Sequence, residues 1–148
     1  MDPKVSAASA DLFWVPAHDA RRGANVITTV TAPHGYSKKR LADLRAHTPE
    51  PIAALGKLRV AVALGGPNEV YRYTAEAVEH LAGALRSLAA LGAGLMIAPS
   101  RRTPESLIER VDEVCRGLPA WVWRGQGENP YPHFLAHADA FIVPADSV

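Results

Sequence analysis

The sequence has little cysteine, little net charge and no long apolar run, and each shortage excludes a class of protein. A single cysteine, Cys115, cannot form a disulfide within the chain. The longest apolar stretch, residues 88–99, contains two glycines and is far shorter than the roughly 20 residues that span a bilayer. Sixteen basic and fifteen acidic side chains give a net charge of +1, so we expect no nucleic-acid partner. The N-terminal residues lack the apolar core of a secretion signal, and these features together predict a reducing, cytoplasmic setting.

Several motifs of catalysis and nucleotide binding are also absent. The Gly65-Gly66 pair lacks the later glycines of the dinucleotide fingerprint G-x-G-x-x-G. No P-loop G-x-x-x-x-G-K-[ST] and no nucleophile elbow G-x-S-x-G occurs. His133 and His137 are spaced i, i+4, but no third ligand accompanies them at a suitable spacing. We therefore expect neither a metal nor a cofactor.

From residue 57 onward, apolar runs alternate with segments of helical period. The composition, 48% hydrophobic and 21% charged, is that of an ordinary globular domain. Apolar runs separated by helices predict a parallel α/β sheet covered by helices on both faces. The helical period also turns Cys115 toward the core. The predicted strands cover residues 58–64, 95–98, 120–123 and 140–143, and the predicted helices cover residues 71–91, 104–117 and 131–138.

The segment before residue 57 is predicted to form a separate layer. Residues 11–15 and 24–29 have the pattern of two strands, and residues 37–46 that of a helix. The stretch His47-Thr48-Pro49-Glu50-Pro51 holds two prolines with no room for a helix between them. The sequence therefore predicts a first region over residues 1–46, a linker over residues 47–56 and a main domain over residues 57–148.

Polar or glycine-containing segments follow all four predicted strands of the main domain. In open parallel sheets, ligands bind outside the carboxyl ends of the strands, where the strand order reverses. Four such segments on one edge predict a binding cleft, although turns favour the same residue types. The segments are Gly65-Gly66-Pro67-Asn68, Ser100-Arg101-Arg102-Thr103, Arg124-Gly125-Gln126-Gly127 and Asp146-Ser147.

Ser100-Arg101-Arg102-Thr103-Pro104 is the strongest candidate for an anion site. Backbone N–H groups at a helix N-terminus carry partial positive charge, and guanidinium groups bind phosphate or carboxylate oxygens in pairs. Helix capping is the structural alternative, because Ser and Thr are common N-caps and Pro is favoured at the first helical position.

Three further groups have a functional and a structural interpretation. His18-Asp19 is either an acid/base pair beside Arg21 and Arg22 or a pair of turn residues. Lys38-Lys39-Arg40 either meets a phosphate or is a solvated charge run. Trp121 and Trp123 share one face of a strand, which favours packing under a helix over a partner surface.

Several short motifs together resemble the ELM-type family of mitochondrial fission proteins, which also has bacterial members. The resemblance covers the chain from about residue 11 to the end. It implies a fold similar to GT-B glycosyltransferases, in which two Rossmann-like domains enclose a nucleotide-sugar site. The motifs are Pro16-Ala17-His18-Asp19, Gly23-Ala24-Asn25-Val26, Gly65-Gly66-Pro67, Ser100-Arg101-Arg102-Thr103-Pro104, Asn129-Pro130-Tyr131, and Ala138-Asp139 with Asp146-Ser147-Val148.

The resemblance also implies roles for single residues. Gly65, Gly66 and Asn68, with Ser100 to Thr103, would line the phosphate side of the cleft, and Asp146 and Ser147 would approach the nucleotide. Pro144 stands where the family pattern has Thr, and a Ser-rich loop and an acidic helix would follow Val148. We therefore expect the second half of a GT-B fold cut from a longer protein, inactive as this piece.

Two functions follow from this resemblance. In the first, the chain binds a nucleotide-diphosphate sugar, Arg101 and Arg102 neutralise the leaving diphosphate, and His18 is the candidate base for an unidentified acceptor hydroxyl. In the second, the chain is a non-enzymatic interaction module at a membrane, which the full-length protein would contact peripherally. Exposed tryptophans would favour the second function, and burial of Trp121 and Trp123 would weaken it.

Overall fold

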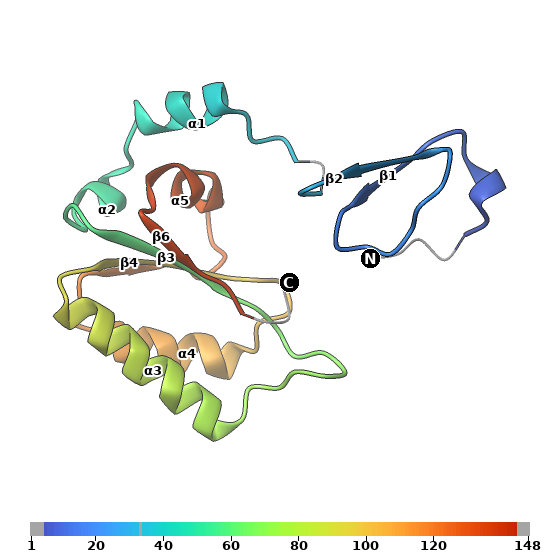
Figure 1. Ribbon diagram of the computed structural model, residues 1–148. Coiled ribbons are helices and arrows are strands. Elements are labelled where there is room, and N and C mark those ends of the chain that lie inside the picture. Colours follow the sequence, from blue (N-terminus) through green and yellow to red (C-terminus); the bar gives the residue numbers. More distant parts are fainter. Residues whose placement is uncertain (1–4, 33, 145–148) are drawn as a thin grey trace. The chain divides into compact units, whose positions relative to one another are not determined.

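The chain forms two compact units that divide between Tyr36 and Ser37. The structure, a computed structural model, describes residues 5–32 and 34–144 (Figure 1). Asp146 and Ser147, two of the predicted site residues, lie outside the described residues.

The first unit is built on two short parallel strands. A 3₁₀ turn (Ala7–Ser9) precedes β1 (Phe13–Pro16) and β2 (Val26–Thr29), which pair in register from Phe13 with Val26 to Pro16 with Thr29. Phe13 and Val15 are buried, while the indole N–H of Trp14 donates to Thr29 Oγ1 at 2.7 Å. Both strands lie where the sequence predicted them, within two residues at the ends.

The second unit contains a four-stranded parallel sheet. Its strands are β3 (Arg59–Leu64), β4 (Gly94–Pro99), β5 (Ala120–Val122) and β6 (Ala140–Ile142), in the spatial order β5-β4-β3-β6. The chain runs outward from β3 to β5 and then returns to the other side of β3 as β6. The strand order therefore reverses between β3 and β6, and the predicted α/β class is confirmed as a Rossmann-like parallel sheet.

Helices cover both faces of this sheet, as predicted. Figure 1 shows α3 (Ala75–Ala90) and α4 (Glu105–Cys115) on one face, and α2 (Glu50–Ala53) and α5 (Tyr131–His137) on the other. The remaining helix, α1 (Lys38–Arg45), packs on α5, where Arg45 Nε donates to the carbonyl of Ala136 at 2.5 Å. Of the described helices, none is both long and apolar enough to cross a membrane.

Alternate residues of the central strands supply two separate core layers. Val60 and Val62 of β3 pack with α3 and α4 in the first core layer. Ala61, which lies between them, faces the second core layer, which contains Phe134 of α5. This alternation follows from the period of two along a strand, and it explains why both faces need apolar residues. Cys115 is buried in the first layer, as its helical position predicted.

The expected linker over residues 47–56 is wrong, because this segment is folded into the second unit. Pro49 is the N-cap of α2 and Pro51 lies in its first turn, where the missing N–H of a proline needs no partner. Ile52 and Leu55 are buried in the second core layer. Leu55 also packs so tightly on β4 that a Cβ at Gly94 would lie 2.5 Å from the Cβ of Leu55.

The two units consequently divide ahead of α1 rather than at the prolines. The assignment of residues 1–46 to the tail of a preceding domain stays a prediction for residues 5–32, while α1 belongs to the second unit.

Candidate functional site

Two of the four predicted loops are joined at the carboxyl edge of β3 and β4. The amide of Ser100 donates to the carbonyl of Leu64 at 2.9 Å. The hydroxyl of Thr103 lies 2.8 Å from the carbonyl oxygen of Leu64 and 2.7 Å from that of Gly65, within donating distance of both. The end of β3 and the segment that leads from β4 into α4 therefore form one hydrogen-bonded unit.

Gly66 makes this close approach possible. A Cβ built on Gly66 would lie 2.5 Å from the carbonyl oxygen of Arg102 and 2.7 Å from its carbonyl carbon, closer than real Cβ contacts come. The backbone of Gly66 is not in the left-handed region, so the glycine is needed for space and not for its conformational freedom. A residue with a side chain would push the two loops apart.

The hydroxyls of Ser100 and Thr103 are engaged inside the loop. Thr103 Oγ1 accepts from the Ser100 amide at 2.8 Å, and Ser100 Oγ accepts from the Arg102 amide at 3.2 Å. The helix α4 begins at Glu105, its N-cap is Pro104, and no side chain caps it. Neither hydroxyl is therefore the helix cap that the structural alternative suggested. The exposed side chains of Arg101 and Arg102 are the groups that this loop presents to solvent.

Asn68 organises the tip of the loop between β3 and α3. Its side-chain Oδ1 accepts from the backbone amides of Val70 at 2.8 Å and Tyr71 at 2.7 Å. Its backbone N–H donates to the Tyr71 carbonyl at 2.9 Å. This closed turn holds Val70 and Tyr71 in solvent, where their side chains are 78% and 48% exposed. Asn68 thus shapes a loop beside the predicted site.

The third predicted loop is bound to α4. The guanidinium of Arg124 pairs with Glu105 at 3.2 Å and with Asp112 at 3.4 Å. These exposed pairs each contribute little to stability, but they give Arg124 carboxylate partners on α4. The segment from Arg124 to Gly127 therefore does not leave a free cation for the predicted cleft.

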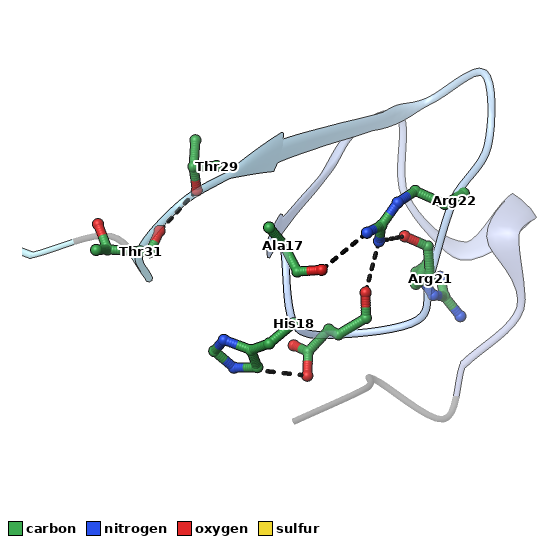
Figure 2. A network of polar contacts seen from close by, with 7 residues as sticks. Ala17, His18, Arg21, Arg22, Thr29 and Thr31 are labelled. Carbon is green, nitrogen blue, oxygen red and sulfur yellow. Dashed lines mark hydrogen bonds and ion pairs between the residues drawn. The ribbon is translucent and has the colours of Figure 1, made fainter. Parts of the chain in front are cut away.

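His18 lies in the loop after β1, in a network centred on Arg22 (Figure 2). The Arg22 guanidinium donates to the carbonyls of Ala17 at 2.8 Å, Asp19 at 2.5 Å and Arg21 at 2.7 Å. His18 Nε2 is 3.9 Å from Asp19 Oδ1, too far for a hydrogen bond, and the His18 side chain is 68% exposed. His18 belongs to the first unit and the loops of Gly66 and Arg102 to the second, so its role as a base stays a prediction.

Other titratable side chains considered in the sequence analysis contact neighbouring residues of the second unit. The rings of His133 and His137 stack at 5.9 Å, and no group of three or more potential metal-binding side chains occurs within residues 5–32 and 34–144. Burial is the main cause that lowers the pKa of His137, and the nearby Arg59, His133 and Arg45 also lower it. A hydrogen bond to the backbone of Leu44 raises the pKa but does not outweigh these effects. In the run Lys38-Lys39-Arg40, Lys39 pairs with Asp43 at 3.1 Å on the exposed side of α1.

The structure also contains a pocket that the sequence did not predict. Trp121 and Trp123 pack against the second core layer, as their shared strand face predicted, and both are half-buried. Their indole rings form part of a cavity of about 410 Å³ beside β5. The full lining is Pro49, Pro51, Trp121, Trp123, Gln126, Glu128, Asn129, Pro130 and His133.

Comparisons with known proteins establish the family of the chain. The sequence model of the family described as Mitochondrial fission ELM1 matches residues 1–148. The curated Mitochondrial fission protein ELM1 of Arabidopsis thaliana is 32% identical over 125 residues, which is 84% of this chain and 29% of that relative. No solved structure matches the chain. The resemblance to the family is thus confirmed, whereas the similarity to GT-B glycosyltransferases stays a prediction.

Proposed function

The chain belongs to the mitochondrial fission ELM1 family, and we propose that its second unit binds the diphosphate of a nucleotide sugar at the carboxyl edge of β3 and β4. The observation that carries this proposal is the contact of Gly66 with the backbone of Arg102. It brings a glycine-rich turn and two exposed arginines to one place beside the point where the strand order reverses.

The chemistry of this edge suits a phosphate group better than a neutral ligand. Guanidinium groups bind phosphate oxygens through paired, charge-assisted hydrogen bonds. Arg101 and Arg102 are adjacent and exposed, and the loop that carries them is fixed by the hydroxyl of Thr103. A fixed loop loses less conformational entropy when a ligand binds, which favours affinity.

Transfer of the sugar would be a property of a longer protein, because the chain spans 29% of the length of its curated relative. In that reaction Arg101 and Arg102 would stabilise the negative charge that develops on the leaving diphosphate. Asp146 and Ser147 would approach the nucleotide, and His18 would take the proton of the acceptor hydroxyl.

The test is a titration with UDP, GDP, ADP and their sugar conjugates, followed by the backbone amide shifts of the chain. Saturable shifts at Gly65, Gly66 and residues 100–103 for one nucleotide are expected. They should disappear in the double variant Arg101→Ala/Arg102→Ala. The control Arg86→Ala/Arg116→Ala removes the same charge from exposed arginines elsewhere in the second unit and should leave the shifts intact. If no nucleotide moves these amides, the diphosphate site is refuted.

A second function is favoured by the exposed apolar tip of the loop between β3 and α3. Val70 and Tyr71 are held in solvent by Asn68, and the curated relative is named for mitochondrial fission. An apolar tip that is followed directly by an exposed arginine, Arg72, can insert into the interface of an anionic membrane, which would make the chain an interaction module. Trp121 and Trp123 do not support this function, because both pack against the core. Co-sedimentation with anionic phospholipid vesicles, lost in Val70→Ser/Tyr71→Ser, would support it.

A further inference from the structure

The pocket beside β5 has apolar walls and a polar rim. Its walls are the indole rings of Trp121 and Trp123 and three proline rings, of which Pro49 is the N-cap of α2 and Pro51 lies in its first turn. Its rim carries two amides, one carboxylate and one imidazole, from Gln126, Asn129, Glu128 and His133. No lysine or arginine lines it, so the pocket is not built for an anion.

The walls are held in place by contacts of their own. The ring of Trp121 meets the buried ring of Phe134 edge to face, with 5.4 Å between the ring centres. The indole N–H of Trp123 donates to the carbonyl of Gln126 at 2.7 Å, which fixes the ring against the following loop. Rings that are already ordered offer a flat apolar surface to a ligand at little further cost in entropy.

The rim retains unused hydrogen-bonding capacity. In the part of the chain that the structure describes, the Glu128 carboxylate and the Gln126 side-chain amide have no ion pair or hydrogen bond to another residue. Asn129 uses Oδ1 to accept from the Tyr131 amide at 3.0 Å, which leaves its N–H groups to donate. The buried Nδ1 of His133 has no hydrogen-bond partner in the described structure.

A neutral saccharide matches this combination. The C–H face of a pyranose ring is apolar and suits an indole, while its hydroxyls both donate and accept around the whole ring. A carboxylate accepts from hydroxyls, and amide and imidazole N–H groups donate to them.

We propose that the pocket lined by Trp121, Trp123 and Glu128 is a binding site for a neutral saccharide. The proposal goes beyond the diphosphate site, because no residue of the pocket belongs to the loops of Gly66 and Arg102. The two sites can therefore succeed or fail separately.

The three tryptophans give a direct test, because each indole N–H has its own NMR signal. Glucose, N-acetylglucosamine and cellobiose are titrated separately into the chain, to about 20 mM, the range in which weak ligands with a Kd of about 1 mM saturate. At least one saccharide should move the signals of Trp121 and Trp123 saturably. The signal of Trp14, which lies in the first unit, should stay in place.

Two carboxylate variants complete the test. Glu128→Gln should weaken saccharide binding about tenfold, because a hydrogen bond to a charged acceptor is lost. Glu109→Gln, on an exposed position of α4 outside the pocket, should leave binding unchanged. Both side chains are exposed, so both variants should fold.

Three results would overturn the proposal. They are an absence of indole shifts with every saccharide, shifts that survive unchanged in Glu128→Gln, and shifts produced by uridine or adenosine but by no saccharide. The last would identify a nucleobase pocket instead. Failure of the diphosphate site would appear only at the amides of residues 65–66 and 100–103, in the separate titration with nucleotides.

Discussion

The hydroxyl oxygen of Thr103 lies 2.7 Å from the carbonyl oxygen of Gly65, across a sequence separation of 38 residues. This bond, together with the one to Leu64, couples the turn after β3 to the turn after β4. The position of Arg101 and Arg102 at the candidate site therefore depends on a side chain that is not expected to touch the ligand.

Thr103→Val should lower the free energy of unfolding by about 1–3 kcal/mol, because it replaces the hydroxyl with a methyl group of similar size and leaves the part-buried carbonyl of Gly65 without its hydrogen-bond donor. Urea denaturation measures the change. Thr48→Val, at an exposed position of the same unit, is the matched control and should stay within about 0.5 kcal/mol of the parent. Equal losses in both variants would show that the Thr103 bonds are unimportant.

Gly66→Ala should separate the two loops, since the new methyl group would overlap the backbone of Arg102. We expect a loss of about 1–3 kcal/mol in stability from overpacking, together with weakened nucleotide binding. Gly83→Ala in α3 is the control, because its new Cβ would meet no atom within 4 Å. This substitution should stabilise the helix by about 0.5–1 kcal/mol. Thermal unfolding compares the two, and a Gly66→Ala variant as stable as the parent would contradict the close approach.

Cys115 should be nearly unreactive in the folded chain. Burial, and to a lesser extent the charge of Asp112, raises the pKa of its thiol from 9.0 to about 11. At pH 8 the thiolate that attacks iodoacetamide is therefore scarce. Alkylation followed by mass spectrometry should be slow at pH 8 and fast in denaturant. Because the unfolded thiol ionises first, stability should also fall between pH 9 and pH 11. Rapid labelling of the folded chain at pH 8 would refute the burial of this thiol.

Acid should lower the free energy of unfolding, in part through protonation of His137. Burial lowers the pKa of this imidazole below its ordinary value of 6.5, so the unfolded state binds the proton first as the pH falls. Stability from this group is present above pH 6.5 and is lost below it. Urea denaturation at neutral and mildly acidic pH should show a smaller loss in His137→Gln than in the parent. An equal loss in both would assign the effect to other groups.

The sheet and its helices could be predicted from the sequence because buried parallel strands appear in it as short apolar runs. Val60 to Leu64 and Leu95 to Ala98 face core on both sides, so nearly every residue in them is apolar. The short helix α2 could not be predicted in the same way, since four residues show no helical period. In the structure, α2 is anchored to the core by Ile52, which is completely buried.

The candidate site was predictable only in part. The rule that carboxyl ends of parallel strands share an edge brought Gly66 and Arg102 together correctly. The contacts of the Thr103 hydroxyl with the carbonyls of Leu64 and Gly65 depend on a close approach of the two loops, which residue spacing in the sequence does not reveal. The pocket of Trp121 and Trp123 was missed because Pro49 and Pro51, which complete it, lie some 70 residues earlier in the sequence.

The contact of Arg45 with Ala136 has a consequence for synthesis on the ribosome. The two residues are 91 positions apart, and chains grow at about 5–20 residues per second, so α1 leaves the ribosome roughly 5–20 seconds before its partner exists. During that interval the apolar side chains of α1 have only the growing sheet or solvent to meet. The element that begins the second unit therefore gains this contact only once α5 has been made, shortly before β6 completes the sheet.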